Sequence, residues 1–563
     1  MTRCTLYRKI RQYLLTNTCY VAESLDPKER GHGEELVELA VKVLVENRSK
    51  ANDSDSTDDV MWSLLVAVLI LESVQIRRTV SSPLRLASCA IYGLLYAPDI
   101  AAVHFSSLDI KGILHETLTG HWMVPILLAA SASSKQVQKW LDGIGNIHEQ
   151  QLSEAADAFF TAFENGSYSK VPEMVDFWET LRNSSSSAIW RTESSIQSLQ
   201  KAVGDVEQLR KAAEESSASL QSIELDRLYY VEDLSTRPSW FPPLPAISIT
   251  TAIGDWWQCQ GKASNRWPWW HHMVAGEREC EEALNWRSAM EKGLRRRISL
   301  TKILSMLLSP KPLSEEDLME GKRVVQEAWG TKVEMEGSTN DSRGTPPLLP
   351  VLFETGFAIH RFARCAANSH SDTMADDMST HCVAARSALS VLVESSSQVC
   401  RHLADALTRK EGQCTALILP ANASIAFASE LVSEHMAWIS SCFVSWRKLM
   451  DELMDELMDD DSKIQLLNEL RQASSSLDAS VQFLMHALQS CVDIDIHAAA
   501  KDLVKELEGR LDGCSALWEH ESEFDAESAI AKLLEAQKGT ANRLIESGER
   551  VLKNLKLVKQ LTK

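Results

Sequence analysis

The chain has 563 residues, of which 44% are hydrophobic and 24% are charged. This balance is typical of a folded protein and excludes the apolar-poor, highly charged composition of disordered chains. The formal net charge of −20 argues against a protein that wraps around nucleic acid, because such binding requires lysine and arginine to neutralise phosphates. We therefore expect no DNA partner.

The chain also lacks the sequence signals of membrane proteins and secreted proteins. Its longest apolar run, Val60–Leu71, is 12 residues long, whereas a membrane-spanning helix needs about 20. Residues Met1–Cys4 do not lead into the apolar region of a signal peptide. Twelve cysteines without a C-x-x-C pair predict free buried thiols. We therefore expect a cytoplasmic protein with no membrane partner.

Apolar residues recur at helical spacing along almost the whole chain, so the predicted fold class is all-α. Short helices with brief connectors in residues 1–183 indicate a degenerate helical-repeat solenoid of the tetratricopeptide-like kind. The predicted helices are Glu34–Asn47, Met61–Arg77, Leu84–Tyr96, Ile110–Ala130, Lys135–Gly143, Leu152–Asn165 and Lys170–Leu181.

The last two of these helices form the clearest repeat-like pair. An apolar stripe lies within Ala158–Phe163, and Asn165 with Gly166 is a helix-stop signal. Pro172 then stands in the first turn of the next helix, where its missing N–H costs nothing. The pair is therefore predicted to be a helix–turn–helix unit.

A different organisation is predicted for residues 184–308. Heptad-like spacing of apolar residues predicts one long helix over Ser184–Leu225. Prolines and tryptophans crowd residues 238–268, which predicts an ordered, aromatic-packed crossing. A connecting helix over Glu277–Leu308 follows.

Residues 309–347 are predicted to be a polar loop region, with the most polar stretch at Glu334–Pro347. Residues 348–563 are predicted to form a C-terminal bundle of long helices that ends in a basic terminal helix. The predicted helices are Leu349–Ser369, Ser379–Leu407, Ala423–Leu457, Ile464–Cys491, His497–Leu517 and Ala526–Leu561.

Searches for catalytic motifs find no convincing site. The nearest match to an acetyl-CoA pyrophosphate loop is Arg30–Glu35, but no strand precedes it and Glu35 stands where a small residue is needed. Phosphate-binding and zinc-peptidase motifs are absent. The spacing of His271 and His272 fits no standard metal site. We expect neither a catalytic residue nor a bound metal.

Two basic clusters stand out against the acidic background, and each has two interpretations. One comprises Lys292 and Arg295–Arg297, and the other lies on the terminal helix. They either complement the negative C-terminal end of a helix dipole or contact RNA or an acidic partner. The candidate ribosome or RNA contacts on the terminal helix are Arg550, Lys553, Lys556 and Lys559.

Four segments of the sequence resemble the auxiliary, non-catalytic subunit of the NatB N-terminal acetyltransferase complex, in the same order and at similar distances. The first two are Ser106–Thr117 and Phe163–Glu193, the third combines Trp286-Arg287 with Arg297–Thr301, and the fourth is Leu544–Glu549. Each segment is short, and the agreement lies in their register along the chain. The resemblance covers Ala101–Leu308 and the last 25 residues.

The resemblance implies a scaffold without catalytic residues. In this family the auxiliary subunit wraps a separate GNAT-fold catalytic subunit and helps to tether it to the ribosome. The complex acetylates nascent chains that begin Met-Asp, Met-Glu, Met-Asn or Met-Gln. No cofactor is therefore expected on this chain, and acetyl-CoA is expected on the partner catalytic subunit.

Polar residues beside the family-like turns are the candidate partner-binding residues: Asp109, Lys111, Lys170 and Glu173. They could equally cap helices or face water. The resemblance further implies a chain that is short on its N-terminal side. Two other interpretations stay open, namely a helical-repeat scaffold of an unrelated cytosolic assembly and an enzyme with an unrecognised helical active site.

Overall fold

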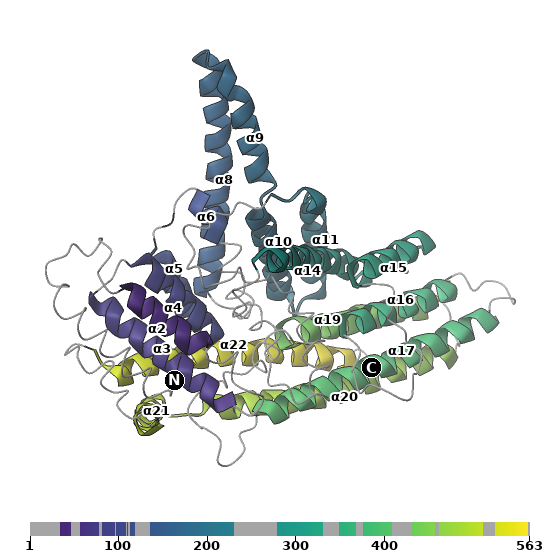
Figure 1. Cartoon of the computed structure of the whole chain (residues 1–563). Coiled ribbons are helices and arrows are strands. Elements are labelled where there is room, and N and C mark those ends of the chain that lie inside the picture. Colours follow the sequence, from purple (N-terminus) through teal and green to yellow (C-terminus); the bar gives the residue numbers. More distant parts are fainter. Residues whose placement is uncertain are drawn as a thin grey trace.

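A computed structural model defines the fold of the chain (Figure 1). It describes residues 34–46, 57–77, 81–95, 97–108, 110, 113–118, 135–229, 279–329, 348–367, 375–407, 431–456, 461–510 and 524–560. Within these ranges the chain forms helices and turns, and its β-type pairing is limited to one isolated bridge between Ser184 and Tyr229. The prediction of an all-α protein is confirmed.

The N-terminal helices pack into one group beside the rest of the molecule (Figure 1). They are α2 (Glu34–Glu46), α3 (Thr57–Arg77), α4 (Ser82–Leu94) and α5 (Pro98–Ser106), and the short helix α6 (Ile113–Leu118) follows them in the chain. Gln75 of α3 donates a buried 2.6 Å hydrogen bond to Ser88 of α4. Helix α5 is absent from the predicted elements, although Pro98 at its first turn is a typical start signal.

Helix α8 (Lys135–Glu164) is one continuous helix where the sequence predicted two. The prediction of a break between Gly143 and Leu152 is wrong, because isolated glycines are tolerated inside a helix at a modest cost. After α8 come a 3₁₀ turn at Tyr168–Lys170 and helix α9 (Val171–Arg182). The helix–turn–helix predicted around Asn165–Pro172 is confirmed.

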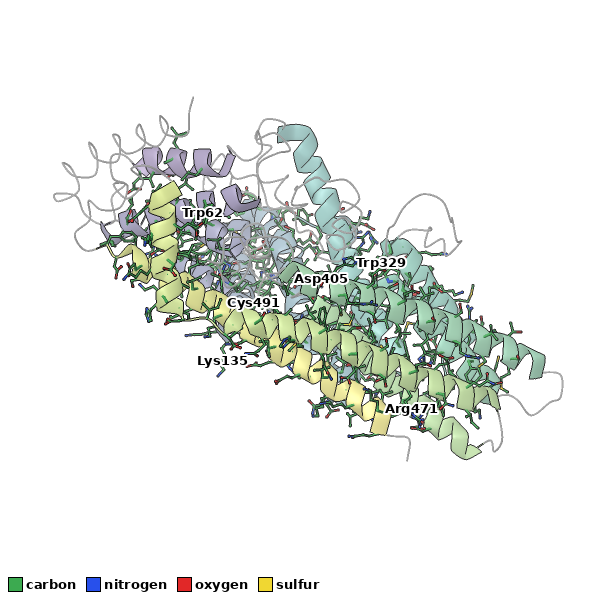
Figure 2. The ribbon with its side chains drawn as sticks, turned by 90° about the horizontal axis from the view of Figure 1, so that it is seen from below. Trp62, Lys135, Trp329, Asp405, Arg471 and Cys491 are labelled. Atoms are coloured by element: carbon green, nitrogen blue, oxygen red, sulfur yellow. The ribbon has the colours of Figure 1, made fainter. Side chains whose placement is uncertain are left out.

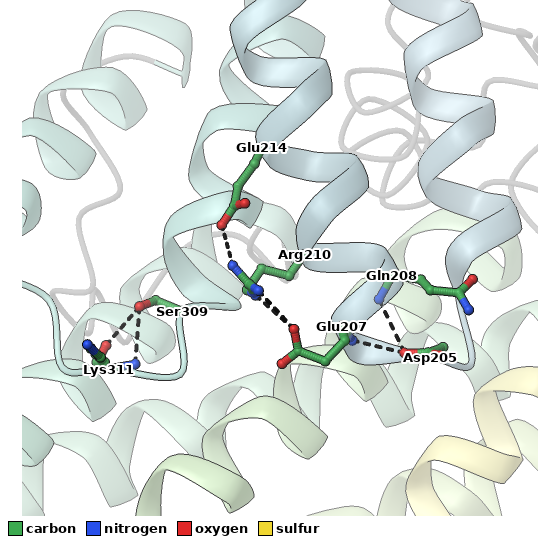
Figure 3. Close-up of polar contacts among 7 residues, drawn as sticks. All are labelled: Asp205, Glu207, Gln208, Arg210, Glu214, Ser309 and Lys311. Atoms are coloured by element: carbon green, nitrogen blue, oxygen red, sulfur yellow. Dashed lines mark hydrogen bonds and ion pairs between the residues drawn. The ribbon is translucent and has the colours of Figure 1, made fainter.

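The long helix predicted over Ser184–Leu225 is in fact two helices, α10 (Ser185–Ala202) and α11 (Val206–Leu220). Gly204 adopts a positive φ of 110°, which ends the first helix. The Asp205 carboxylate then accepts hydrogen bonds from the backbone N–H groups of Glu207 and Gln208 and caps the second helix (Figure 3). The dipeptide Gly204-Asp205 is thus a stop signal followed by a start signal.

Helix α14 (Glu279–Leu307) matches the predicted connecting helix to within two residues at each end. Helix α15 (Glu315–Trp329) lies inside residues 309–347, which the sequence assigned to a polar loop region. That assignment is wrong for α15, because Leu318, Val324 and Val325 make an amphipathic helix whose apolar side is buried. Residues 334–347 lie outside the described residues, as does the tryptophan-rich stretch 238–268.

The C-terminal part contains the long helices that the sequence predicted, seen from below in Figure 2, where Arg471 and Cys491 mark two positions along α20. The elements are α16 (Leu348–Ala367), α17 (Ala375–Leu407), a π-helical turn η7 (Leu431–His435), α19 (Met436–Glu456), α20 (Asp461–Val492), α21 (Ile496–Arg510) and α22 (Ala526–Gln560). Six cysteines of the described ranges are free thiols, and five of them are buried.

Helix α22 joins the two ends of the chain. It packs on α19, α20 and α21 and also contacts α3 and α5 of the N-terminal group. Gln537 donates a buried 2.7 Å hydrogen bond to the carbonyl of Leu95, and Arg543 forms a 2.8 Å ion pair with Asp99. One hydrophobic core therefore extends from Val37 to Val558, while the domain boundaries predicted from the sequence stay predictions.

Helix α8 approaches α10 closely at a single glycine. A Cβ atom on Gly145 would collide with the indole ring of Trp190, whose Nε1 donates a 2.9 Å hydrogen bond to the carbonyl of Leu141. Gly143, two residues earlier in the same helix, has open space around the position of a Cβ atom. The absence of a side chain at Gly145 thus sets how α8 sits on the body.

We expect opposite effects on stability from Gly145→Ala and Gly143→Ala. The second change stabilises by about 0.5–1 kcal/mol, because alanine is the better helix former. The first gains the same term but must displace a hydrogen-bonded indole, which as overpacking costs about 1–3 kcal/mol. Denaturant unfolding of both variants checks the signs, and equal stabilisation of both would contradict the close contact.

Candidate partner-binding surfaces

Helices α8 and α9 form a hairpin that stands out from the body of the molecule (Figure 1). We call residues 153–182 the projecting hairpin. Between residues 153 and 180, Ala155 alone is buried. The two helices pack on each other, and their outer surfaces face solvent.

The tip of the projecting hairpin is a regular helix end. Gly166 has a φ of 68°, its N–H bonds to the carbonyl of Phe163 at 3.1 Å, and the N–H of Ser167 bonds to the carbonyl of Ala162 at 2.9 Å. These two bonds are the Schellman arrangement, which satisfies the last carbonyls of α8. The turn is therefore fixed by backbone hydrogen bonds and by a residue that tolerates positive φ.

Exposed aromatic side chains gather on the projecting hairpin. Five of the 13 large hydrophobic side chains that are exposed in the described residues lie here, within 18 residues of sequence: Phe160, Phe163, Tyr168, Val175 and Phe177. Phe163 packs edge-on against Tyr168, with ring centroids 5.5 Å apart. Exposed apolar residues that cluster on one element mark interaction sites more often than scattered ones do.

Two of the four predicted partner-binding residues lie at this tip. Lys170 and Glu173 are both exposed and form an ion pair of 2.9 Å with each other. Asp109 and Lys111 lie outside the described residues. The assignment of Lys170 and Glu173 as partner contacts stays a prediction, and the sequence did not predict that the aromatic side chains near them would be exposed.

The base of the projecting hairpin is held by buried polar contacts. His148 of α8 contacts the carboxylate of Glu116 through Nδ1 at 3.0 Å, and both side chains are buried. The hydroxyl of Ser186 at the start of α10 donates to the backbone carbonyl of Glu116. Helices α6, α8 and α10 are thereby tied together at the point where the hairpin leaves the body.

A buried ion cluster joins α10, α14 and the π-helical turn η7. The guanidinium of Arg297 donates to the carboxylate of Glu193 at 2.8 Å and to that of Glu434 at 3.2 Å. Gln200 donates a further 3.2 Å hydrogen bond to Glu434. Glu193 and Arg297 come from two of the segments on which the family resemblance rests, whereas no sequence signal identified Glu434.

Burial and the neighbouring charges together shift the pKa values of the groups in this cluster. Burial disfavours the charged form of Arg297, but the attraction of Glu193 and Glu434 outweighs it and raises the pKa of the guanidinium. Burial raises the pKa of Glu193, while Arg297 opposes that shift. Burial, together with the positive charge of Arg297, lowers the pKa of the neighbouring His435 to about 3. The cluster is a structural ion pair network with one cation and two carboxylates.

This geometry corrects both interpretations of the first basic cluster for two of its four cations, Arg296 and Arg297. Arg297 is buried in the ion cluster, and the buried Arg296 donates a 3.0 Å hydrogen bond to the carbonyl of Ala328. Arg295 pairs with the exposed Asp226 at 3.4 Å, and Lys292 is exposed. Two of the four cations therefore hold helices together inside the protein, because their guanidinium groups lie on the inward side of α14.

The second basic cluster is partly engaged. Lys559 pairs with Asp478 of α20 at 2.7 Å, and Arg550 donates to the carbonyl of Gln200 at 3.4 Å. Lys553 and Lys556 are exposed on α22. Of the four predicted RNA contacts, Lys553 and Lys556 are thus the two most accessible to a partner.

Helices in the described ranges are too short or too polar to cross a membrane. In the same part of the chain, no three histidine, cysteine or acidic side chains gather as ligands of a metal ion. His271 and His272 lie outside the described residues.

Comparisons with known proteins give one consistent relationship at the sequence level. Residues 5–229 match the family model described as "N-acetyltransferase B complex (NatB) non catalytic subunit". The N-terminal acetyltransferase B complex auxiliary subunit NAA25 of Arabidopsis thaliana is 28% identical over 233 residues. That match covers 39% of this chain and 21% of the relative, so the similarity extends over about a fifth of the length of the relative.

A comparison with solved structures also gives two matches. They are the NatB acetyltransferase complex bound to a bisubstrate inhibitor and the same complex bound to CoA and MES, each with 12% identity and a TM-score of 0.42. The similarity covers 91% of this chain in both cases, and 54% and 52% of the matched chains.

We expect Arg297→Met to destabilise the protein by about 3–5 kcal/mol, because it leaves two carboxylates buried without their cation. Arg210→Met is the matched control, since Arg210 also bonds two carboxylates, Glu207 and Glu214, but on the surface of α11 (Figure 3). The control change costs at most about 1 kcal/mol. Equal losses in urea unfolding would contradict the buried cluster.

Proposed function

We propose that the chain is a non-catalytic subunit of the NatB type, because residues 5–229 match the model of that family. It binds a GNAT-fold catalytic subunit and positions that subunit for the acetylation of nascent N-termini. The substrates are chains that begin Met-Asp, Met-Glu, Met-Asn or Met-Gln, and the complex acts in the cytoplasm. The family match is the observation that carries this proposal.

Several features of the chain support a scaffold role over a catalytic one. The Glu193–Arg297 pair joins two family-like segments that lie 104 residues apart in the sequence. The packed helices of the N-terminal group and the projecting hairpin agree with a degenerate tetratricopeptide-like array, an architecture that commonly presents surfaces to protein partners. Acetyl-CoA belongs on the partner, and this chain supplies no catalytic residue.

A helical-repeat scaffold of an unrelated assembly is the alternative function. Its supporting observation is that the family match ends at residue 229, so the long helices that follow could serve another partner. The two functions differ in the identity of the bound subunit.

Co-expression with a NatB-type catalytic subunit separates these functions. We expect the two chains to elute together in size-exclusion chromatography, with the mass of a 1:1 complex, and the complex to acetylate a Met-Asp peptide. The catalytic subunit of a different N-terminal acetyltransferase is the control and should elute alone. Two independently eluting species would reject the NatB function, and acetylation by this chain alone would support an enzyme.

We further propose that the terminal helix α22 contacts ribosomal RNA through Lys553 and Lys556. Both side chains are exposed, whereas Lys559 is held by Asp478 and Arg550 by the backbone of α10. The alternative is a purely structural role, in which these cations complement the negative end of the helix dipole, since they lie in the last turns of α22. Lysines that neutralise phosphate make binding weaken steeply with salt.

We expect Lys553→Glu with Lys556→Glu to weaken co-sedimentation with ribosomes and to lower the slope of log affinity against log salt by up to about 2. Lys501→Glu with Lys505→Glu on α21 is the control, because these lysines are equally exposed and the charge change is the same. Binding of the catalytic subunit should be unchanged in both. Equal sedimentation of the two variants would reject the RNA contact.

A further inference from the structure

We propose that the projecting hairpin, residues 153–182, inserts into a basic, apolar-lined cleft on the catalytic subunit. This inference rests on the proposed function and assigns to it a surface of this chain. The occupant is a folded protein partner whose lysine or arginine side chains surround an apolar floor. Three independent properties of the hairpin argue for that chemistry.

The first property is apolar exposure without a partner. Phe160, Phe163 and Tyr168 are 60%, 55% and 63% exposed, whereas the large aromatic residues of the core, such as Trp438 and Phe353, are fully buried. Phe160 contacts the ring of Phe159 and Phe163 that of Tyr168, but more than half of each of the three side chains stays in water. Aromatic side chains of this kind are the residues that contribute most to protein interfaces.

The second property is the charge of the hairpin. It carries six acidic and two basic side chains: Glu154, Asp157, Glu164, Glu173, Asp176, Glu179, Lys170 and Arg182. Both cations are already engaged, since Lys170 pairs with Glu173 and Arg182 lies over the ring of Trp178 at 5.3 Å.

The remaining acidic groups are available to a partner. Among the described residues, no ion pair involves Asp157, Glu164, Asp176 or Glu179, and all four side chains are exposed. A partner that buries the aromatic tip must therefore meet these carboxylates, and a neutral or acidic surface would leave them uncompensated. Charge complementarity thus favours a basic rim around the apolar floor.

The third property is a fixed presentation. The tip is closed by the Schellman hydrogen bonds around Gly166, and the base is held by Trp190 against Gly145 and by the Glu116–His148 contact. A hairpin ordered before binding loses less conformational entropy on association. The projecting hairpin is therefore built as a rigid insert.

The test uses the full chain co-expressed with the catalytic subunit. Phe160→Ser, Phe163→Ser and Tyr168→Ser combined should weaken binding more than tenfold while leaving the unfolding midpoint unchanged, because these side chains are exposed. Val383→Ser with Phe483→Ser is the control, since both residues are exposed apolar side chains on other helices, α17 and α20. This control should bind as the wild type does.

A second variant probes charge independently of the aromatic residues and of folding. Glu164→Lys with Asp176→Lys should weaken binding and reduce its sensitivity to salt. Glu316→Lys with Glu508→Lys, exposed on α15 and α21, is the matched charge control and should leave both quantities unchanged.

The outcomes separate this inference from the proposed function. Loss of binding in both hairpin variants, with both controls intact, supports the insert. Wild-type binding with unaffected hairpin variants overturns the inference alone and leaves the NatB function standing. Failure of the wild type to bind overturns both. Self-association of this chain that the hairpin variants abolish would overturn the inference, because a second copy would then be the occupant.

Discussion

A buried positive charge needs negatively charged or hydrogen-bonding groups beside it to replace the water that it has lost. This requirement determines which side chains surround Arg297 at the centre of the molecule. Arg297 of α14 lies against Glu193 of α10 and Glu434 of the π-helical turn. The three elements come from distant parts of the sequence, and their placement in the structure brings both carboxylates to the guanidinium. A π-helical turn is uncommon, and here it presents Glu434 to the guanidinium, so the local irregularity has a defined partner.

The rest of the fold follows from this centre. Helix α10 carries Glu193 and Gln200 to the cluster, and it also carries Trp190, which holds α8 at Gly145. The position of the projecting hairpin is thereby linked to the ion cluster through a single helix. On the other side, α22 reaches α10 through Arg550 and the N-terminal group through Arg543. The two ends of the chain are thus held together around a shared core.

Much of this arrangement was predictable, and the failures have physical causes. Periodicity gave the long C-terminal helices, because each has an apolar side of constant spacing. Periodicity predicted one helix in place of α10 and α11, because the heptad spacing of apolar residues continues across the break. The local signal of Gly204-Asp205 predicts the break correctly. Periodicity also missed α15, whose overall polarity hides the short apolar stripe. Charge counting assigned Arg296 and Arg297 to a basic cluster that complements a helix dipole or contacts a partner, since a sequence does not show which cations meet a buried carboxylate.

The projecting hairpin shows the converse problem, because there the sequence pattern indicates burial and the structure shows exposure. The apolar stripe of Ala158, Phe159, Ala162 and Phe163 follows the pattern of a core-facing helix, yet Ala158 and Phe163 are exposed and the other two are only half-buried. An apolar side predicts burial against something, but it does not say whether that surface belongs to the same chain. Within residues 153–180 Ala155 alone is buried, and the outer surface of the hairpin combines aromatic rings with carboxylates for which the described residues show no ion pair. The disagreement between pattern and burial therefore supports the proposal that another protein covers this element.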